Sequence, residues 1–355
     1  MKVLSMYLPQ FHKVKENDEW WGEGYTDWNS AQNARPLYEG HYQPHLPYNQ
    51  YYYDLMNKST LEWQASLMKK YGIDGQCIYH YWFKDGRQIL EKPIEKLLEW
   101  KDIDMPFCFD WANQSWAYSW CAVKGVNVWN EKLDKHRGGR TGLLLEQQYG
   151  DEKEWRQHFE YLLPFFRDER YIKVDGKPVF VLHIPEDIPV IAEMTACWRR
   201  WAGDEGLNGI YFIGAYNTNE EFVDAVFYPA PTVATASLLT GEMADCHPSV
   251  LDYRAVWEYL IRRAYKEKDH MVGAFTGYDD TPRRGTKGMV IDHASPEIFK
   301  ESLAELMAIN ASHNQPFTFI NAWNEWGEGM HLEPDEKDGF AYLEAVSYAK
   351  KQYQN

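Results

Sequence analysis

The chain has 355 residues, a length that one α/β barrel can account for, so we expect a single domain over residues 1–355. Its 53 acidic residues outnumber 37 basic ones, giving a net charge of -16. This balance argues against nucleic acid and anionic membranes as partners, because both attract an excess of Lys and Arg. No apolar run reaches membrane-spanning length and the N-terminus turns polar early, so we expect no membrane insertion and a cytoplasmic protein.

Short apolar runs predict eight strands, in chain order Val3–Leu8, Gly75–Phe83, Pro106–Trp111, Pro178–Ile184, Ile210–Tyr216, Ala225–Tyr228, Met271–Thr276 and Phe317–Ala322. Stretches with a helical period separate most of them, at Leu61–Tyr71, Trp155–Arg167, Leu251–Lys266, Ile298–Ile309 and Phe340–Tyr353. This alternation predicts a parallel sheet closed into a (β/α)8 barrel. The alternative is an open doubly wound sheet, but no glycine-rich phosphate-binding motif follows any strand.

The connection from Phe11 to Asp54 is long and holds ten Trp and Tyr residues. Connections of this length are usually functional or disordered, and one this aromatic is not expected to be disordered. We interpret it as a lip folded over the binding cleft. A structural plug over the barrel end is the alternative, and the two are compatible.

Polar and aromatic residues cluster just after the predicted strands. In a barrel these positions converge on the face that carries active sites. Aromatic residues make up 16% of the chain, more than a core requires, and flat rings in such clusters favour stacking on sugars. The substrate-binding candidates are His12, Trp20, Trp21, Tyr79, His80, Tyr81, Trp82, Asp110, Trp111, Asn113, Gln114, Trp116, His183, Tyr216, Tyr278, Asp279, Arg283, Trp323, Asn324 and Trp326. Taken alone, His80 or His183 is more often a core histidine, and Asp110 could cap a helix.

The segment Phe317–Gly329 carries the strongest indication of chemistry. It begins as an apolar strand and ends in two acids, Glu325 and Glu328, flanked by Trp323, Trp326 and glycines. Carboxylates can transfer protons to and from a glycosidic bond, while indole faces stack on sugar rings. The alternative is a strand end followed by a helix cap.

These motifs resemble the WbsX-type proteins, described as glycosyltransferases of polysaccharide biosynthesis and related to glycoside hydrolase family 99. The resemblance runs the length of the chain, through Tyr7–His12, Asn17–Trp21, Gly40–Pro44, Glu91–Pro93, Trp111–Asn113, Tyr171–Pro178, Pro282–Arg284, Asn324–Gly329 and His331–Pro334.

The resemblance implies that Glu325 is the base on a sugar 2-hydroxyl, that Glu328 is the acid on the leaving oxygen, and that Tyr7 is an active-site tyrosine. A 1,2-anhydro sugar would be the intermediate, as in substrate-assisted variants of the two-carboxylate scheme. Internal attack requires the 2-oxygen anti to the leaving group, as in α-mannosides and α-rhamnosides. Gln114 stands where relatives commonly have a glutamate, which puts the sugar specificity in doubt.

We therefore predict a retaining glycoside hydrolase that needs no cofactor and takes an oligo- or polysaccharide. A surface-polysaccharide glycosyltransferase using the same pocket is the first alternative, although no metal-nucleotide D-x-D motif is obvious. A non-catalytic glycan-binding barrel is the second. His331, Glu333, Asp335 and Asp338 lie close in sequence, but their spacing does not match a calcium loop and no H-E-x-x-H motif occurs, so we expect solvated acids and no metal ion. Cys77 and Cys108 lie in apolar runs and are expected to be buried free thiols.

Overall fold

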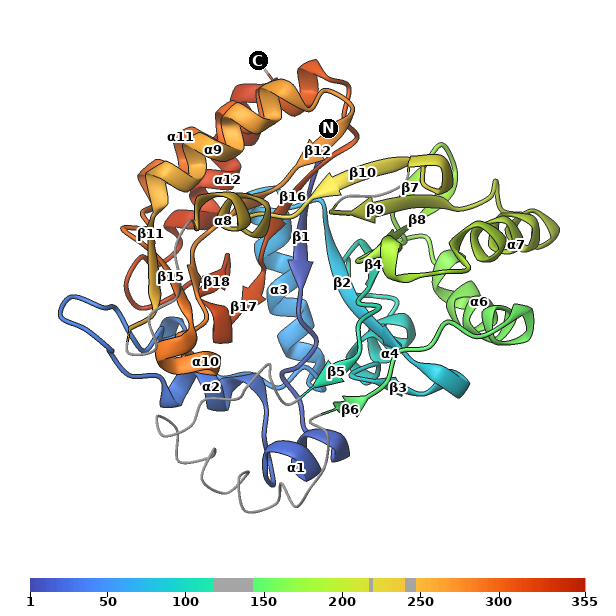
Figure 1. The fold of residues 1–355 in the computed structure, drawn as a ribbon, viewed down its shortest axis with the longest axis horizontal. Helices are drawn as coiled ribbons and strands as arrows, with labels where there is room; N and C mark the ends of the chain where they lie inside the picture. The colour runs from blue at the N-terminus through green and yellow to red at the C-terminus, as the bar shows by residue number, and fades with distance from the viewer. Residues whose placement is uncertain (118–142, 217–219, 240–246, 355) are drawn as a thin grey trace.

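The protein is a (β/α)8 barrel (Figure 1). The computed structural model describes residues 1–117, 143–216, 220–239 and 247–354. Neighbouring barrel strands are parallel and follow one another in chain order around the sheet. They are β1 (Lys2–Tyr7), β2 (Gly75–Trp82), β4 (Phe107–Trp111), β8 (Lys177–Leu182), β9 (Tyr211–Ala215), β10 (Ala225–Tyr228), β12 (His270–Val272) continued by β13 (Ala274–Phe275), and β16 (Phe317–Asn321). The predicted barrel and its eight strands are confirmed, and the open doubly wound alternative is excluded.

The barrel closes at the interruption between β12 and β13. Strand β12 pairs with β10, and β13 pairs with β16. Gly273 separates the two halves, and its amide donates to the carbonyl of Tyr228 at 3.0 Å. A Cβ at this position would lie 2.8 Å from the Phe227 ring, so only glycine lets the strand turn from one neighbour to the other.

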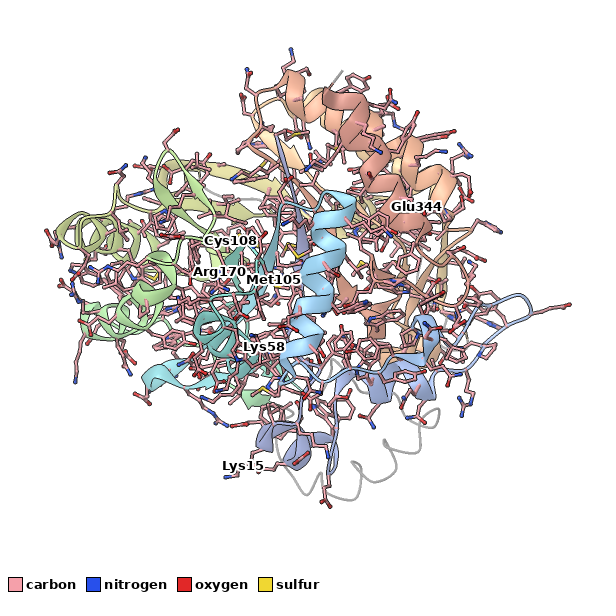
Figure 2. The ribbon with its side chains drawn as sticks, turned by 180° about the vertical axis from the view of Figure 1, so that it is seen from behind. Lys15, Lys58, Met105, Cys108, Arg170 and Glu344 are labelled. Atoms are coloured by element: carbon pink, nitrogen blue, oxygen red, sulfur yellow. The ribbon has the colours of Figure 1, made fainter. Side chains whose placement is uncertain are left out.

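Helices follow the barrel strands and cover the outside of the sheet. Seen from behind, α3 (Lys58–Tyr71) lies across the barrel (Figure 2). It ends at Gly72, which takes the left-handed conformation that caps helices. The other helices that the periodicity predicted are also present, as α6 (Glu152–Phe166), α9 (Tyr253–Lys266), α11 (Pro296–Ser312) and α12 (Ala341–Gln354).

Two local predictions of the sequence analysis need adjusting. The first residues of the predicted helix Leu251–Lys266 belong to strand β11 (Ser249–Asp252), which pairs with β15 (Met289–Asp292). The helical pattern was also overlooked in α4 (Lys92–Glu99), α7 (Ile191–Asp204) and α8 (Thr232–Leu238).

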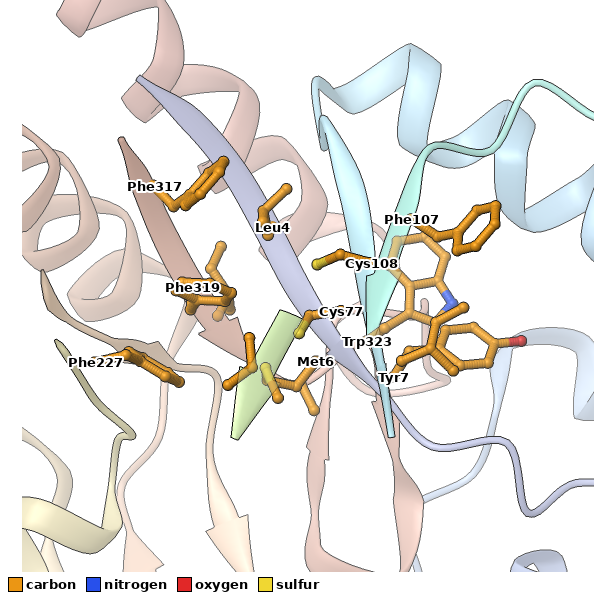
Figure 3. Packing of buried hydrophobic residues seen from close by; sticks show 14 of the residues in the cluster. Leu4, Met6, Tyr7, Cys77, Phe107, Cys108, Phe227, Phe317, Phe319 and Trp323 are labelled. Carbon is orange, nitrogen blue, oxygen red and sulfur yellow. The ribbon is translucent and has the colours of Figure 1, made fainter. Parts of the chain in front are cut away.

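The core fills the barrel interior and the layer beneath the helices. Figure 3 shows part of it, with Leu4 and Phe319 among the fully buried side chains. Cys77 and Cys108 face each other in the register of β2 and β4 and are buried and free, as predicted. Cys121 and Cys246 lie outside the described residues. In the part of the chain that the structure describes, no helix is both long and apolar enough to span a membrane.

The long aromatic connection folds onto the end of the barrel toward which β1 points (Figure 1). It contains α1 (Lys15–Trp21), α2 (Asp27–Asn33) and the 3-10 turn η1 (Tyr48–Gln50). At the same end lie α10 (Thr281–Arg284), η7 (Trp326–Glu328) and the hairpin of β17 (Asn324–Glu325) with β18 (Met330–His331). Residues from distant parts of the chain therefore meet over the C-terminal ends of the strands.

We predict that Gly273→Ala lowers the free energy of unfolding by about 1–3 kcal/mol, the usual cost of overpacking a core. The added methyl group would clash with the Phe227 ring where the barrel closes. Denaturant unfolding measures the change. Gly203→Ala, inside α7 with no atom near the new Cβ, is the control, and it should be neutral or stabilising. Equal stability of the two variants would contradict this account of barrel closure.

Candidate active site

A cavity of about 550 Å³, which we call the main cleft, opens at the C-terminal ends of the barrel strands. Eleven of the predicted site residues line it, namely Trp21, Tyr79, Tyr81, Gln114, Trp116, His183, Tyr216, Tyr278, Arg283, Glu325 and Glu328. They come from all four quarters of the chain, and the barrel brings them together. Trp21, Tyr25 and Asp27 of the long aromatic connection also line it, so that connection forms part of the cleft wall.

Alternation along the strands decides which side chains reach the main cleft. Tyr79 and Tyr81 of β2 line it, whereas His80 and Trp82 point to the other face. His80 Nε2 lies 2.8 Å from His158 Nε2 of α6, and Trp82 stacks on the same His158 ring. Both residues pack between the barrel and α6, so they do not belong to the cleft.

The same alternation corrects the placement of Tyr7. Met6 and Leu8 line the main cleft, and Tyr7 between them faces α3. Its hydroxyl donates to Gln64 Oε1 at 2.9 Å, and the side chain is buried. Tyr7 therefore does not share the cleft with the two glutamates, contrary to the sequence-based expectation.

One arginine holds the two glutamates together. The Arg283 guanidinium contacts Glu325 Oε2 at 3.0 Å through Nη2, and its Nη1 donates to Glu328 Oε1. Nη2 also lies 3.0 Å from Asp27 Oδ1 at the start of α2. Arg283 therefore joins three carboxylates that come from three separate elements, and it fixes the two glutamates on adjacent nitrogens of one planar group.

Gly327 lets Asp27 and Arg283 approach this loop. Its amide donates to Asp27 Oδ2 at 3.0 Å. A Cβ there would lie 2.7 Å from Arg283 Nε and 2.8 Å from Asp27 Oδ2. The contact of Arg283 with the three carboxylates therefore requires a glycine at position 327.

Burial and mutual repulsion set the charge of the pair. Burial, followed by the neighbouring Glu328 charge, raises the pKa of Glu325 to about 8, although Arg283 opposes the shift. Burial also raises the pKa of Glu328, again opposed by Arg283. The Glu325 side chain is 8% exposed and that of Glu328 is 26% exposed. Near neutral pH the pair therefore retains a proton, and the deeper burial of Glu325 favours the protonated form of that residue.

A histidine–aspartate contact lies elsewhere on the cleft wall. His183 lines the main cleft, and its Nδ1 lies 2.9 Å from Asp110 Oδ2 on β4. Burial disfavours the charged imidazole, but the Asp110 carboxylate outweighs it, so the pKa of His183 is raised. Asp110 does not line the main cleft, so it affects the cleft through its contact with His183.

Asn113 also lies behind the cleft wall and does not line the cleft. Its side chain donates to the Ile184 carbonyl and accepts from the Ile184 amide.

Aromatic side chains build a second wall. The Tyr81 ring meets Trp116 edge to face, with centroids 5.2 Å apart. Trp20 packs behind Trp116 at 5.8 Å and does not line the cleft itself. Trp21 and Trp116 are thus the indoles that both reach the cleft and belong to the predicted site.

The remaining predicted residues are structural neighbours of the cleft. His12, Trp111, Asp279, Trp323, Asn324 and Trp326 are buried and do not line it. Asn324 accepts from the Leu8 amide and donates to the Leu8 carbonyl, so it ties the loop after β16 to β1. Asp279 accepts from Gln43 Nε2 and lies 2.7 Å from His41 Nε2, so it anchors the aromatic connection.

A buried carboxylate, Glu333, supports the acid-bearing loop from behind. It accepts one hydrogen bond of 2.8 Å from each of four donors, the indoles of Trp323 and Trp326, the amide of Gln64 and the hydroxyl of Tyr53. Burial raises its pKa to about 7, while the four donors favour the charged form. The two tryptophans predicted to bind sugar thus serve to hold this loop.

The expectation of solvated acids after the pair is wrong for most of the segment. His331, Glu333 and Asp335 are 5%, 2% and 4% exposed. Asp338 is half-buried. The segment folds back over the barrel end instead of extending into solvent, which sequence spacing does not reveal.

Asp27, Asn321 and Asp280 line the cleft but were not among the predicted site residues. Asn321 lies near the end of a predicted strand, and Asp280 directly follows the predicted site residues Tyr278 and Asp279, so both positions were available from the sequence. Asp27 was not, because it lies in the long connection, 256 positions from Arg283.

The protein is thus a (β/α)8 barrel whose cleft has aromatic walls and holds a pair of carboxylates joined by an arginine. A family model described as "Glycosyltransferase WbsX" matches residues 3–346, so the chain belongs to the WbsX family. Proteins named WxcX from two strains of Xanthomonas campestris pv. campestris, ATCC 33913 and B100, are 33% and 32% identical over 362 residues, or 98% of this chain. The match covers 49% of each relative, so the chain spans about half the length of the curated relatives it matches.

Solved structures with a similar fold include a GH99 endo-α-mannosidase from Bacteroides thetaiotaomicron. Its TM-score is 0.59 at 15% identity, covering 99% of this chain and 97% of that one. A structure titled "Glycoside hydrolase-like protein" also has a TM-score of 0.59, at 12% identity, covering 98% of this chain and 93% of that one. At these identities the likeness establishes the fold.

We predict that Glu333→Gln destabilises the protein by at least about 1–3 kcal/mol, the cost of an unsatisfied buried polar group. The new amide NH2 would face two of the donors that now bind the carboxylate. Denaturant unfolding is the measurement. Glu336→Gln, an exposed glutamate of the same loop, is the matched control and should be neutral. A stable Glu333→Gln variant would show that the four hydrogen bonds do not support the loop.

Proposed function

We propose that this chain is a carbohydrate-active enzyme that cleaves α-mannoside- or α-rhamnoside-type glycosidic bonds with retention of configuration. One observation carries the proposal. Arg283 holds Glu325 and Glu328 side by side at the wall of a cleft of about 550 Å³ that is lined by tyrosine and tryptophan. Carboxylates in such a position can exchange protons with a bound sugar, and the rings can stack on its apolar faces.

The chemical step needs one base and one acid. Glu325 accepts the proton of the sugar 2-hydroxyl, the 2-oxygen attacks the anomeric carbon, and the glycosidic bond breaks. Glu328 gives its proton to the departing oxygen. Water then attacks the anomeric carbon of the 1,2-anhydro sugar, its proton returns to Glu328, and Glu325 returns its proton to the 2-oxygen. Two inversions at the anomeric carbon give net retention.

Without substrate, burial favours a proton on Glu325, so the scheme requires that proton to move from Glu325 to Glu328. The scheme needs the proton on Glu328, whereas the deeper burial of Glu325 favours that residue in the empty cleft. A sugar oxygen placed against Glu328 favours its protonated form, and a hydroxyl donating to Glu325 favours the carboxylate. Substrate binding therefore moves the single proton of the pair to the acid.

Glycosyl transfer is the second candidate, and the description of the WbsX family favours it. The same pair would serve, with an acceptor hydroxyl instead of water attacking the anhydro sugar. Incubation of an α-mannoside without acceptor sugar and with a low concentration of it separates the two, because a hydrolase releases reducing sugar without an acceptor, whereas a transferase turns over only when the acceptor is present. A glycan-binding barrel would do neither.

We predict that Glu325→Gln and Glu328→Gln each lower turnover by about 10²–10⁴-fold, the usual contribution of a general acid or base. Both changes are nearly isosteric, so folding and glycan binding should persist. Aryl glycosides with good leaving groups need little protonation, so they should restore activity to Glu328→Gln and not to Glu325→Gln. Rates measured on both substrate types test this.

Equal rescue of both variants would contradict the division of roles, and a fully active double variant would favour a binding protein. Glu336→Gln provides the control for expression and handling, since this glutamate is exposed outside the main cleft. The anomer that forms first, followed by NMR, should be the one with retained configuration. An inverted product would refute the anhydro route.

The raised pKa of Glu325 predicts an unusual pH profile. The pair loses its last proton as the pH rises through about 8, so wild-type kcat/KM on an unactivated glycoside should fall over that range. In Glu328→Gln, with an activated glycoside, only ionised Glu325 is required. Its pKa should drop once the Glu328 charge is gone, so activity should rise with pH and then level off. A fall above pH 8 in this variant would show that Glu325 acts as the acid.

A further inference from the structure

A second cavity, of about 340 Å³, lies beside the main cleft. Tyr278 lines both cavities, but neither Glu325 nor Glu328 lines the second one. Three potential metal ligands meet at its wall, namely His45 of the aromatic connection, His331 of β18, and Asp335. Nothing in the chemistry proposed for the main cleft uses these residues.

The three ligand atoms converge on one point. His45 Nδ1 lies 3.1 Å from His331 Nε2, which in turn lies 3.8 Å from Asp335 Oδ2. All three atoms are within 4.8 Å of one another. His331 and Asp335 are 5% and 4% exposed and His45 is half-buried, so this is not a solvated surface cluster.

The hydrogen-bond pattern sets the tautomer of His331. Its Nδ1 lies 3.1 Å from the carbonyl oxygen of Glu333, which can only accept, so Nδ1 carries the proton. Nε2 therefore presents a lone pair toward His45 and Asp335. A backbone carbonyl that orients an imidazole through its far nitrogen is the arrangement that usually supports a metal-binding histidine.

We propose that His45, His331 and Asp335 bind one divalent transition-metal ion, with zinc as the best match. Two imidazole nitrogens and a carboxylate oxygen are typical zinc ligands, and nitrogens that bind a tetrahedral zinc at about 2.0–2.1 Å lie about 3.3 Å apart. The observed 3.1 Å between the histidine nitrogens is close to this value, and Asp335 needs only a small approach. The cavity leaves the fourth position for water. The proposal differs from the sequence-based expectation of no metal ion.

The ion would join two segments that are far apart in the sequence. His45 belongs to the long aromatic connection, whereas His331 pairs with Asn324 in the hairpin that also carries Glu325. The His331 ring stacks on Trp326 with centroids 3.8 Å apart. Because the ion would sit away from the two glutamates, its role would be to hold this hairpin in place. That role does not depend on the proposed glycosidase chemistry.

Zinc binding to the tag-free, chelator-treated chain tests the proposal. Competition with a chromophoric chelator should give one Zn²⁺ per chain, and thermal unfolding should shift to higher temperature with added Zn²⁺. His45→Ala and Asp335→Asn should each weaken binding at least about tenfold and abolish most of the thermal shift. Asparagine can still accept the hydrogen bond that Asp335 Oδ1 receives from the Asp338 amide.

His293→Asn is the matched control and should bind zinc as the wild type does. His293 lines the same cavity but is not one of the three ligands, and asparagine tolerates its positive φ of 64°. X-ray absorption of the zinc-loaded wild type should show imidazole scattering and N/O ligands at about 2.0–2.1 Å. The proposal would be overturned if the wild type showed no saturable zinc binding or no imidazole scattering. It would also be overturned if both ligand variants kept the wild-type affinity, or if the control variant lost affinity equally. A direct hydrogen bond between His45 and His331 would then account for the geometry.

Discussion

The contact of Arg283 with three carboxylates is the interaction on which the rest of the site depends. Asp27 comes from the aromatic connection, Arg283 from α10, and Glu325 and Glu328 from the loop after β16. Removing the arginine would leave buried like charges without a partner, which typically costs several kcal/mol. The aromatic connection and the acid-bearing loop are therefore coupled through Arg283. They are far apart in the sequence, so no local pattern indicates this coupling.

One guanidinium cannot neutralise three carboxylates, and this imbalance affects the protonation of the two glutamates. With every group ionised, the contact would carry a net charge of about -2 in a site that water reaches poorly, a state that desolvation disfavours. A retained proton removes part of this charge, which explains the raised pKa of Glu325. The arginine thus keeps two acids close together, and burial together with the excess negative charge raises the pKa of Glu325. The acid and base roles proposed for the two glutamates need both conditions.

The sequence predicted the barrel because buried parallel strands read as short apolar runs, and all eight runs became strands. The polar and aromatic residues just after the strands also indicated where the cleft lies. The main error in the predicted site was the direction of the side chains, because successive residues along a strand point to opposite faces of the sheet. Tyr7 and His80 face helices while their neighbours Met6 and Tyr81 face the cleft. Contacts such as Arg283 with Asp27, or His45 with His331, join positions more than two hundred residues apart and leave no local pattern.

The β17–β18 hairpin shows how one small element serves two cavities. Glu325 pairs with Met330, and both line the main cleft. The neighbouring pair, Asn324 with His331, faces the other way, with Asn324 bonded to β1 and His331 at the second cavity. Trp326 lies between, stacked on His331 and hydrogen-bonded to Glu333. A shift of His331 therefore cannot occur without moving the strand that carries Glu325. The position of Glu325 in the main cleft is therefore set as much by contacts behind the hairpin as by contacts within the cleft.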